Sequence, residues 1–167
     1  DKNVINRALN SMQLTYNVWD NLKIREKVSY DYINSTETVL WDRFSNDGAP
    51  GGVAQRIINE FNTLNTQTQA SYNKSFGEHN VDALLGFETE DYHYTQTYLS
   101  GESYPGDKYE FENANSTSTQ TDKQGYRLTS FLGRVNYNYA DKYYFGVSYR
   151  RDGSSRLARE NRWGDFW

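Results

Sequence analysis

The sequence contains no cysteine, two prolines and few aliphatic residues in its 167 positions. Without cysteine, the chain forms neither a disulfide framework nor a thiolate metal site. With two histidines besides, the residues argue against a metal site, and we expect no cofactor. Mean hydropathy is −0.95, and no stretch approaches the run of about 18 apolar residues that a membrane-spanning helix needs. The net charge of −4 does not favour nucleic acid as a partner.

Aromatic residues, by contrast, are abundant. They make up 16% of the chain, whereas all hydrophobic residues together reach only 36%. Such a chain has too little aliphatic material for a typical soluble core, yet it is too aromatic to be disordered. Membrane β-barrels combine both properties, because alternate residues face lipid and water and aromatic girdles mark the two interfaces. The composition therefore favours a membrane β-barrel.

Apolar and polar residues alternate with a period of two, which predicts β-strands. In the second run, Leu22, Ile24 and Val28 oppose Lys23, Arg25 and Lys27. Glu26 interrupts the apolar side, so we expect it at the rim or paired locally, since a charge facing lipid costs most near the bilayer midplane. The six predicted strands cover residues 10–19, 22–33, 56–76, 80–99, 124–140 and 142–151.

The connections between these strands differ in length. Short turns near 20, 78 and 141 alternate with long loops at 34–55, 100–123 and 152–163, and both prolines fall in the long loops. Outer-membrane barrels have short periplasmic turns and long extracellular loops. We therefore expect the long loops to be extracellular. Six strands are fewer than the minimum of about eight for a closed membrane barrel, so we expect an interior segment of a larger one, cut at both ends.

A family resemblance rests on one specific motif. Ser130–Tyr143 (SFLGRVNYNYADKY), Arg150–Arg156 (RRDGSSR) and Asn161–Gly164 (NRWG) closely resemble the SusC/RagA family, the TonB-linked outer-membrane transporters of Bacteroidetes. Ala70–Gly86 and Leu22–Tyr32 are compatible with the same family. The resemblance implies part of a plug-containing barrel of about 22 strands that imports oligosaccharides, glycans or peptides.

The same resemblance implies the partners of the chain. A SusD-like surface lipoprotein would cover the extracellular side, and TonB would act through a segment that this chain lacks. The remaining barrel, the plug and lipid or lipopolysaccharide complete the set, with no nucleic acid. No constellation of residues suits catalysis, so we expect no enzyme; alternation places Glu88 and Glu90 on the water-facing side rather than in an acid/base pair.

Two groups of residues are candidates for binding. Loop aromatics could stack on sugar rings or anchor a partner lipoprotein, the alternative being packing within the loops. The loop candidates are Trp41, Phe44, Tyr104, Tyr109, Phe111 and Arg156. Polar residues on the strands suit contact with a plug in the lumen more than substrate recognition. These lumen candidates are Gln67, Gln69, Asn73, Glu88, Arg134, Asn136, Asn138 and Arg150.

Two other function classes stay open at this point. A structural or adhesive β-protein of the cell surface predicts a sequence repeat, and we see none beyond the hairpin spacing. A soluble glycan-binding β-domain predicts a monomer that stays in the aqueous phase without detergent.

Overall fold

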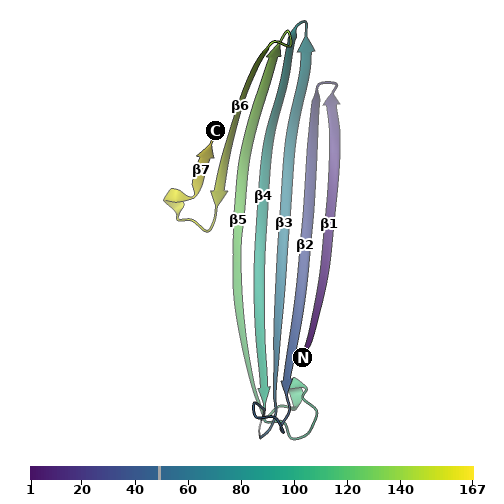
Figure 1. Cartoon of the computed structure of the whole chain (residues 1–167), viewed down its shortest axis with the longest axis vertical. Helices are drawn as coiled ribbons and strands as arrows, with labels where there is room; N and C mark the ends of the chain where they lie inside the picture. Colours follow the sequence, from purple (N-terminus) through teal and green to yellow (C-terminus); the bar gives the residue numbers. More distant parts are fainter. Residues whose placement is uncertain (49) are drawn as a thin grey trace. The chain divides into compact units, whose positions relative to one another are not determined.

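The computed structural model describes residues 1–48 and 50–167, which form seven β-strands and two single-turn 3-10 helices (Figure 1). The strands join in one sheet in sequence order, and this antiparallel all-β architecture confirms the predicted fold class. The elements are β1 (Lys2–Trp19), β2 (Leu22–Trp41), β3 (Val53–Phe76), β4 (His79–Glu102), η1 (Phe111–Asn113), β5 (Ser116–Tyr139), β6 (Tyr143–Ser154), η2 (Arg159–Asn161) and β7 (Trp163–Phe166).

None of the helices in the described part of the chain has the length and apolar character needed to cross a membrane.

Most strands extend further than the alternation predicted. The long connections shorten to residues 42–52, 103–115 and 155–162 as a result. The reason is that a ladder needs only paired N–H and C=O groups, so a strand continues through polar residues where the alternation of side chains has faded. A seventh strand, β7, was not predicted, because four residues are too few to display a period. It pairs with Arg150–Gly153 of β6.

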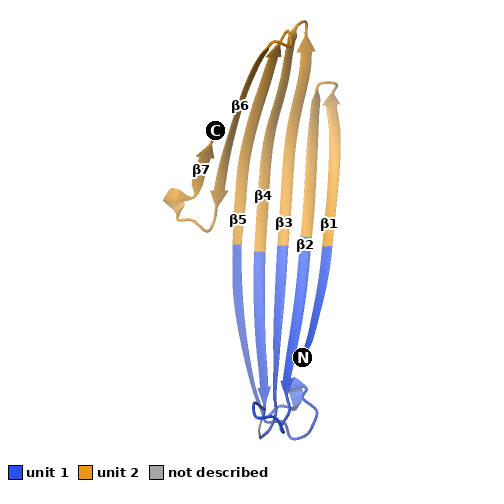
Figure 2. Ribbon diagram, in the orientation of Figure 1, with its two compact units in different colours: residues 1–8, 31–62, 93–125 blue, residues 9–30, 63–92, 126–167 orange. Residues whose placement is uncertain are grey.

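The chain divides into two compact units, which we describe separately (Figure 2). Unit 1 comprises residues 1–8, 31–62 and 93–125 and contains the connections 42–52 and 103–115. Unit 2 comprises residues 9–30, 63–92 and 126–167. It contains the three short turns together with β6 and β7.

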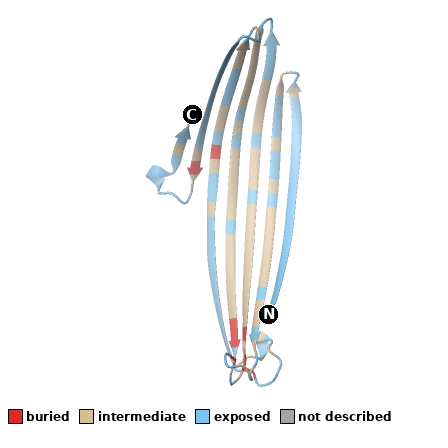
Figure 3. Ribbon diagram, in the orientation of Figure 1, coloured by how far each residue is buried: buried red, intermediate tan, exposed pale blue. Residues whose placement is uncertain are grey.

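Burial is sparse along the described chain (Figure 3). The buried hydrophobic residues are Ala54 and Tyr104, and the buried polar ones are Ser100 and Ser130. Large apolar side chains are exposed instead; Phe145, for example, is 64% exposed. Apolar surface on this scale marks contact with another apolar phase or a partner.

The register of β5 and β6 fixes which residues share a face of unit 2. Val135 lies opposite Val147, and one step along the ladder Asn136 lies opposite Gly146. Directly paired residues point to the same side, and successive residues point to opposite sides. The odd-numbered residues of both strands, such as Phe145, therefore form one face, which we call the apolar face. The even-numbered residues form the polar face.

Candidate functional site

Arg150 is the centre of a hydrogen-bonded cluster on the polar face of unit 2. Its Nε donates to Oδ1 of Asp152 at 2.8 Å, and its Nη2 donates to Oγ of Ser130 at 3.2 Å. The same Nη2 lies 3.5 Å from Oε2 of Glu88, whose Oε1 accepts a hydrogen bond of 2.5 Å from Gln67. Strands β3, β4, β5 and β6 thus each contribute to one cluster, in which Gln67, Glu88 and Arg150 are predicted lumen residues.

The cluster borders a hollow of about 310 Å³ that opens to solvent. Amide, hydroxyl and charged groups line most of it, so it offers hydrogen-bond donors and acceptors to a polar partner. The lining residues that were not among the binding candidates from the sequence are Lys27, Ser29, Asn65, Thr66, Thr89, Glu90, Leu128 and Ser130. Within the described residues, no group of three or more His, Asp or Glu side chains is placed to hold a metal ion.

A second polar cluster surrounds Asp82. Nδ2 of Asn136 donates to Oδ1 of Asp82 at 3.2 Å, and the same oxygen lies 3.8 Å from Nη2 of Arg134. Nearby along the chain, Asn138 is bound into the β5–β6 turn, where its Nδ2 donates to Asp141 at 2.6 Å. Arg134 therefore balances the charge of a carboxylate on the neighbouring strand and Asn136 donates a hydrogen bond to it, whereas Asn138 stabilises its own turn.

Two further predicted residues of unit 2, Asn73 and Arg156, occupy separate positions. The backbone N–H of Asn73 donates to the carbonyl oxygen of Asn21 at 2.9 Å, next to the β1–β2 turn. The guanidinium of Arg156 lies 4.3 Å above the ring of Tyr126, whose hydroxyl donates to Glu90 at 2.8 Å. Arg156 thus packs against the sheet.

The apolar face of unit 2 also carries charged side chains, among them the carboxylate of Glu26. Oε2 of Glu26 accepts a hydrogen bond of 2.5 Å from Thr68, which agrees with the expected local pairing. At the β6–β7 hairpin the same face carries the ion pair of Arg151 and Asp165, 3.6 Å apart, and the guanidinium of Arg151 lies 5.3 Å from the ring of Trp163. The charges of Glu26, Arg151 and Asp165 on this face are therefore satisfied by neighbours.

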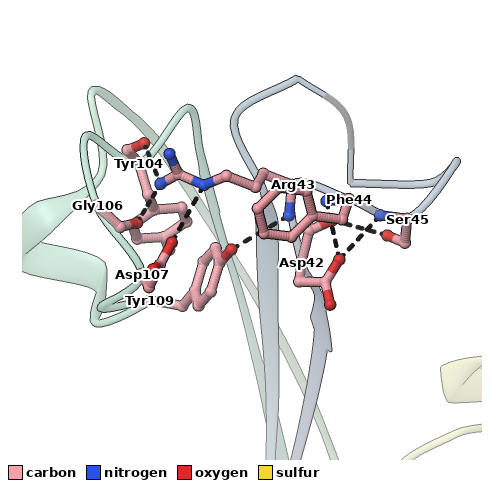
Figure 4. Close-up of polar contacts among 8 residues, drawn as sticks. All are labelled: Asp42, Arg43, Phe44, Ser45, Tyr104, Gly106, Asp107 and Tyr109. Atoms are coloured by element: carbon pink, nitrogen blue, oxygen red, sulfur yellow. Dashed lines mark hydrogen bonds and ion pairs between the residues drawn. The ribbon is translucent and has the colours of Figure 1, made fainter.

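In unit 1, Arg43 joins the two long connections (Figure 4). Its Nη2 donates to the carbonyl oxygens of Tyr104 at 3.2 Å and Gly106 at 2.5 Å. Its Nε lies 3.3 Å from a carboxylate oxygen of Asp107, and its backbone N–H donates to the hydroxyl of Tyr109 at 3.1 Å. Because one side chain contacts three residues of the other connection, residues 42–48, 50–52 and 103–115 form one packed cluster, which we call the loop cluster.

The loop aromatics differ in exposure. Tyr104 is 3% exposed, and its ring meets that of Tyr109 edge-on at 5.1 Å. Phe111 lies 4.9 Å below the guanidinium of Arg56, and Trp41 is half-buried. Phe44, in contrast, is 86% exposed on a turn that Asp42 caps by accepting from the backbone N–H groups of residues 44 and 45 (Figure 4). Most of these aromatics hold the loop cluster together, and Phe44 projects from it.

Burial raises the pKa of the Tyr104 hydroxyl above its ordinary value, and the nearby charge of Glu110 adds to the effect. The hydroxyl oxygen is buried and has no hydrogen-bond partner among the described residues. A buried phenol loses solvation when it ionises, so the loop cluster favours the neutral form.

Comparison with known proteins gives relatives much longer than this chain. The sequence is 33% identical to TonB-dependent receptor P3 of Formosa agariphila over 125 residues, or 71% of this chain and 12% of the relative. It is 28% identical to TonB-dependent receptor SusC of Bacteroides thetaiotaomicron, over 87% of this chain and 14% of the relative. The fold matches the RagAB peptide transporter with a TM-score of 0.82 at 20% identity, over 95% of this chain and 19% of that one. No family model matches the chain.

Proposed function

We propose that this chain, which belongs to the SusC/RagA family of TonB-dependent receptors, forms part of the wall of an outer-membrane β-barrel that imports oligosaccharides, glycans or peptides. The relatives are named as receptors and a transporter, which supports transport rather than catalysis. The chain spans only 12% and 14% of the two curated relatives, so import is a property of the whole receptor.

The proposal rests on the separation of apolar and polar side chains onto the two faces of unit 2. Phe131, Val135, Phe145 and Val147 on the apolar face are 41–64% exposed, whereas the polar face holds the Arg150 and Asp82 clusters. A soluble sheet would bury such an apolar face against a second layer. A barrel wall turns it toward lipid and the polar face toward the lumen.

We propose that the loop cluster lies on the extracellular side and the short turns on the periplasmic side. In this orientation Phe44 is an exposed aromatic available to a ligand or a SusD-like lipoprotein, and Tyr104, Tyr109 and Phe111 act as its support. The polar-face residues Glu88 and Arg150 would contact whatever fills the barrel. TonB would act through a part of the receptor beyond these residues.

Epitope insertion in the full-length receptor tests this orientation. An epitope placed after Asp107 should be accessible to antibody on intact cells. An epitope placed between Asp20 and Asn21 should become accessible only after lysis. Equal access at both positions would exclude a transmembrane wall, and release of the receptor into the aqueous phase would favour the soluble glycan-binding alternative.

Uptake measurements separate the substrate classes. A strain lacking the receptor is supplied with labelled oligopeptides or labelled oligosaccharides, with and without the restored gene. Restoration of uptake for one class identifies it as cargo. Restoration of neither class would contradict the proposed import and favour a structural or adhesive role at the cell surface.

A further inference from the structure

Three cations occupy alternate positions of β2 in unit 2: Lys23, Arg25 and Lys27. Lys27 lines the hollow beside Glu88 and Arg150, which places it on the polar face. Because side chains of a strand alternate, Lys23 and Arg25 lie on that face as well. All three are exposed, and together they form what we call the basic stripe.

The basic stripe lacks the compensation found elsewhere on the polar face. Arg150 is paired with Glu88 and Asp152, and Arg134 with Asp82. No ion pair joins any member of the stripe to a carboxylate within the described residues, although Lys27 and Glu88 border the same hollow.

The neighbouring strands explain this difference. Residues 9–19 of β1 include no charged side chain, and residues 63–76 of β3 include no carboxylate. Within β2, Glu26 points to the opposite face and accepts from Thr68. Over these residues the two strands beside the stripe therefore supply amides and hydroxyls but no carboxylate, and the carboxylates that share the hollow with Lys27 belong to Glu88 and Glu90 of β4.

The spacing of the stripe defines what could bind it. Alternate residues of a strand lie about 6.6 Å apart, so three cations cover about 13 Å. A small anion would reach one or two of them. Carboxylates on alternate residues of an extended peptide have the same spacing and can meet all three.

We propose that the basic stripe binds an acidic, extended segment of the same receptor that lies outside residues 1–167. The proposal rests on the barrel-wall function, which turns the polar face toward the lumen. Most of the length of the curated relatives lies outside the region that this chain matches, so the receptor has ample chain to supply the segment. Binding would place opposite charges against three cations that otherwise repel one another.

Photo-cross-linking in the full-length receptor tests the proposal. A benzophenone amino acid at Ser29, beside Lys27 on the polar face, should cross-link to an acidic segment outside residues 1–167, identified by mass spectrometry. Combining this probe with Lys23→Gln, Arg25→Gln and Lys27→Gln should lower the yield about tenfold, since three exposed charge pairs are lost. Arg134→Gln is the matched control, because it removes a cation already paired with Asp82, and it should leave the yield unchanged.

Other outcomes overturn the inference. Cross-links confined to residues 1–167, cross-links to another protein or a nutrient, or a yield insensitive to the triple substitution would each exclude the acidic segment as partner. The same probe at Ile24, on the apolar face, tests the underlying function independently: it should cross-link to lipid. If Ile24 labels lipid and Ser29 fails, the inference is wrong and the barrel wall stands; if Ile24 labels no lipid, the proposed function fails.

Discussion

The hydroxyl of Thr68 donates a hydrogen bond of 2.5 Å to Oε2 of Glu26. The acceptor is half-buried on the apolar face of unit 2, between Ile24 and Val28, which are 38% and 39% exposed. A carboxylate on a face that we assign to lipid is thus satisfied by a neighbouring strand. This pairing makes the position tolerable without water.

The pair predicts a non-additive response to substitution. Thr68→Val removes the donor and should lower the free energy of unfolding by about 1–3 kcal/mol, because the carboxylate keeps its desolvation penalty. Combining Thr68→Val with Glu26→Leu should restore most of the loss, since two apolar partners need no hydrogen bond. Urea unfolding of the full-length receptor in lipid vesicles measures both. A double variant no more stable than Thr68→Val alone would contradict the pairing.

Two tyrosines of the loop cluster should respond differently to loss of their hydroxyls. Tyr104→Phe removes a buried hydroxyl without a described partner and should leave the cluster equally or more stable. Tyr109→Phe removes the acceptor of the Arg43 backbone N–H and should weaken the cluster by about 0.5–1.5 kcal/mol. Hydrogen exchange of residues 42–48 reads out both variants. Equal protection loss in the two would refute this distinction.

The raised pKa of Tyr104 predicts that the loop cluster weakens in alkali. A group whose folded pKa is raised stabilises the folded form fully below its ordinary value, here 10.0, and loses that contribution as pH rises through the folded pKa. Subtilisin cleavage within the connections should therefore accelerate above this pH in the native protein more than in Tyr104→Phe. Identical pH profiles would show that the hydroxyl does not govern the opening.

Gly153 should tolerate no larger residue. A Cβ there would lie 2.7 Å from ring atoms of Trp163, its partner across the β6–β7 ladder. Gly153→Ala should therefore displace β7 at a cost of about 1–3 kcal/mol, as overpacking does. Gly164→Ala is the control, because the nearest atoms to its Cβ lie at 3.4 Å. Hydrogen exchange of β7 should rise in the first variant only; unchanged exchange would show that the ring yields freely.

The sequence predicted the structure most reliably in strands that have one apolar face. The alternation in β5 and β6 predicted which residues share a face, and the register of Val135 with Val147 agrees with it. The strand ends were missed because Thr- and Ser-rich segments such as residues 116–121 pair through their backbone without alternating side chains. Such pairing leaves no pattern in the sequence.

The Arg150 cluster and the loop cluster show a similar limit: the sequence predicted some of their residues but not the contacts between them. Glu88 and Arg150 were predicted from alternation, but their partner Ser130 was not, because neighbours across a ladder depend on register. Arg43 was missed because it binds the backbone carbonyls of Tyr104 and Gly106, and backbone carbonyls exist at every residue. Contacts of this kind require the fold to be known.

Spin-label accessibility along β5 and β6 tests the central claim most directly. Single nitroxides are placed at Val135 and Val147 on the apolar face and at Asn136 and Ser148 on the polar face of the full-length receptor in lipid vesicles. If this chain is a barrel wall, labels at Val135 and Val147 should collide with oxygen and be shielded from a water-soluble nickel complex. Labels at Asn136 and Ser148 should show less oxygen contact. Nickel access to Val135 and Val147 equal to that at Asn136 and Ser148 would contradict the account.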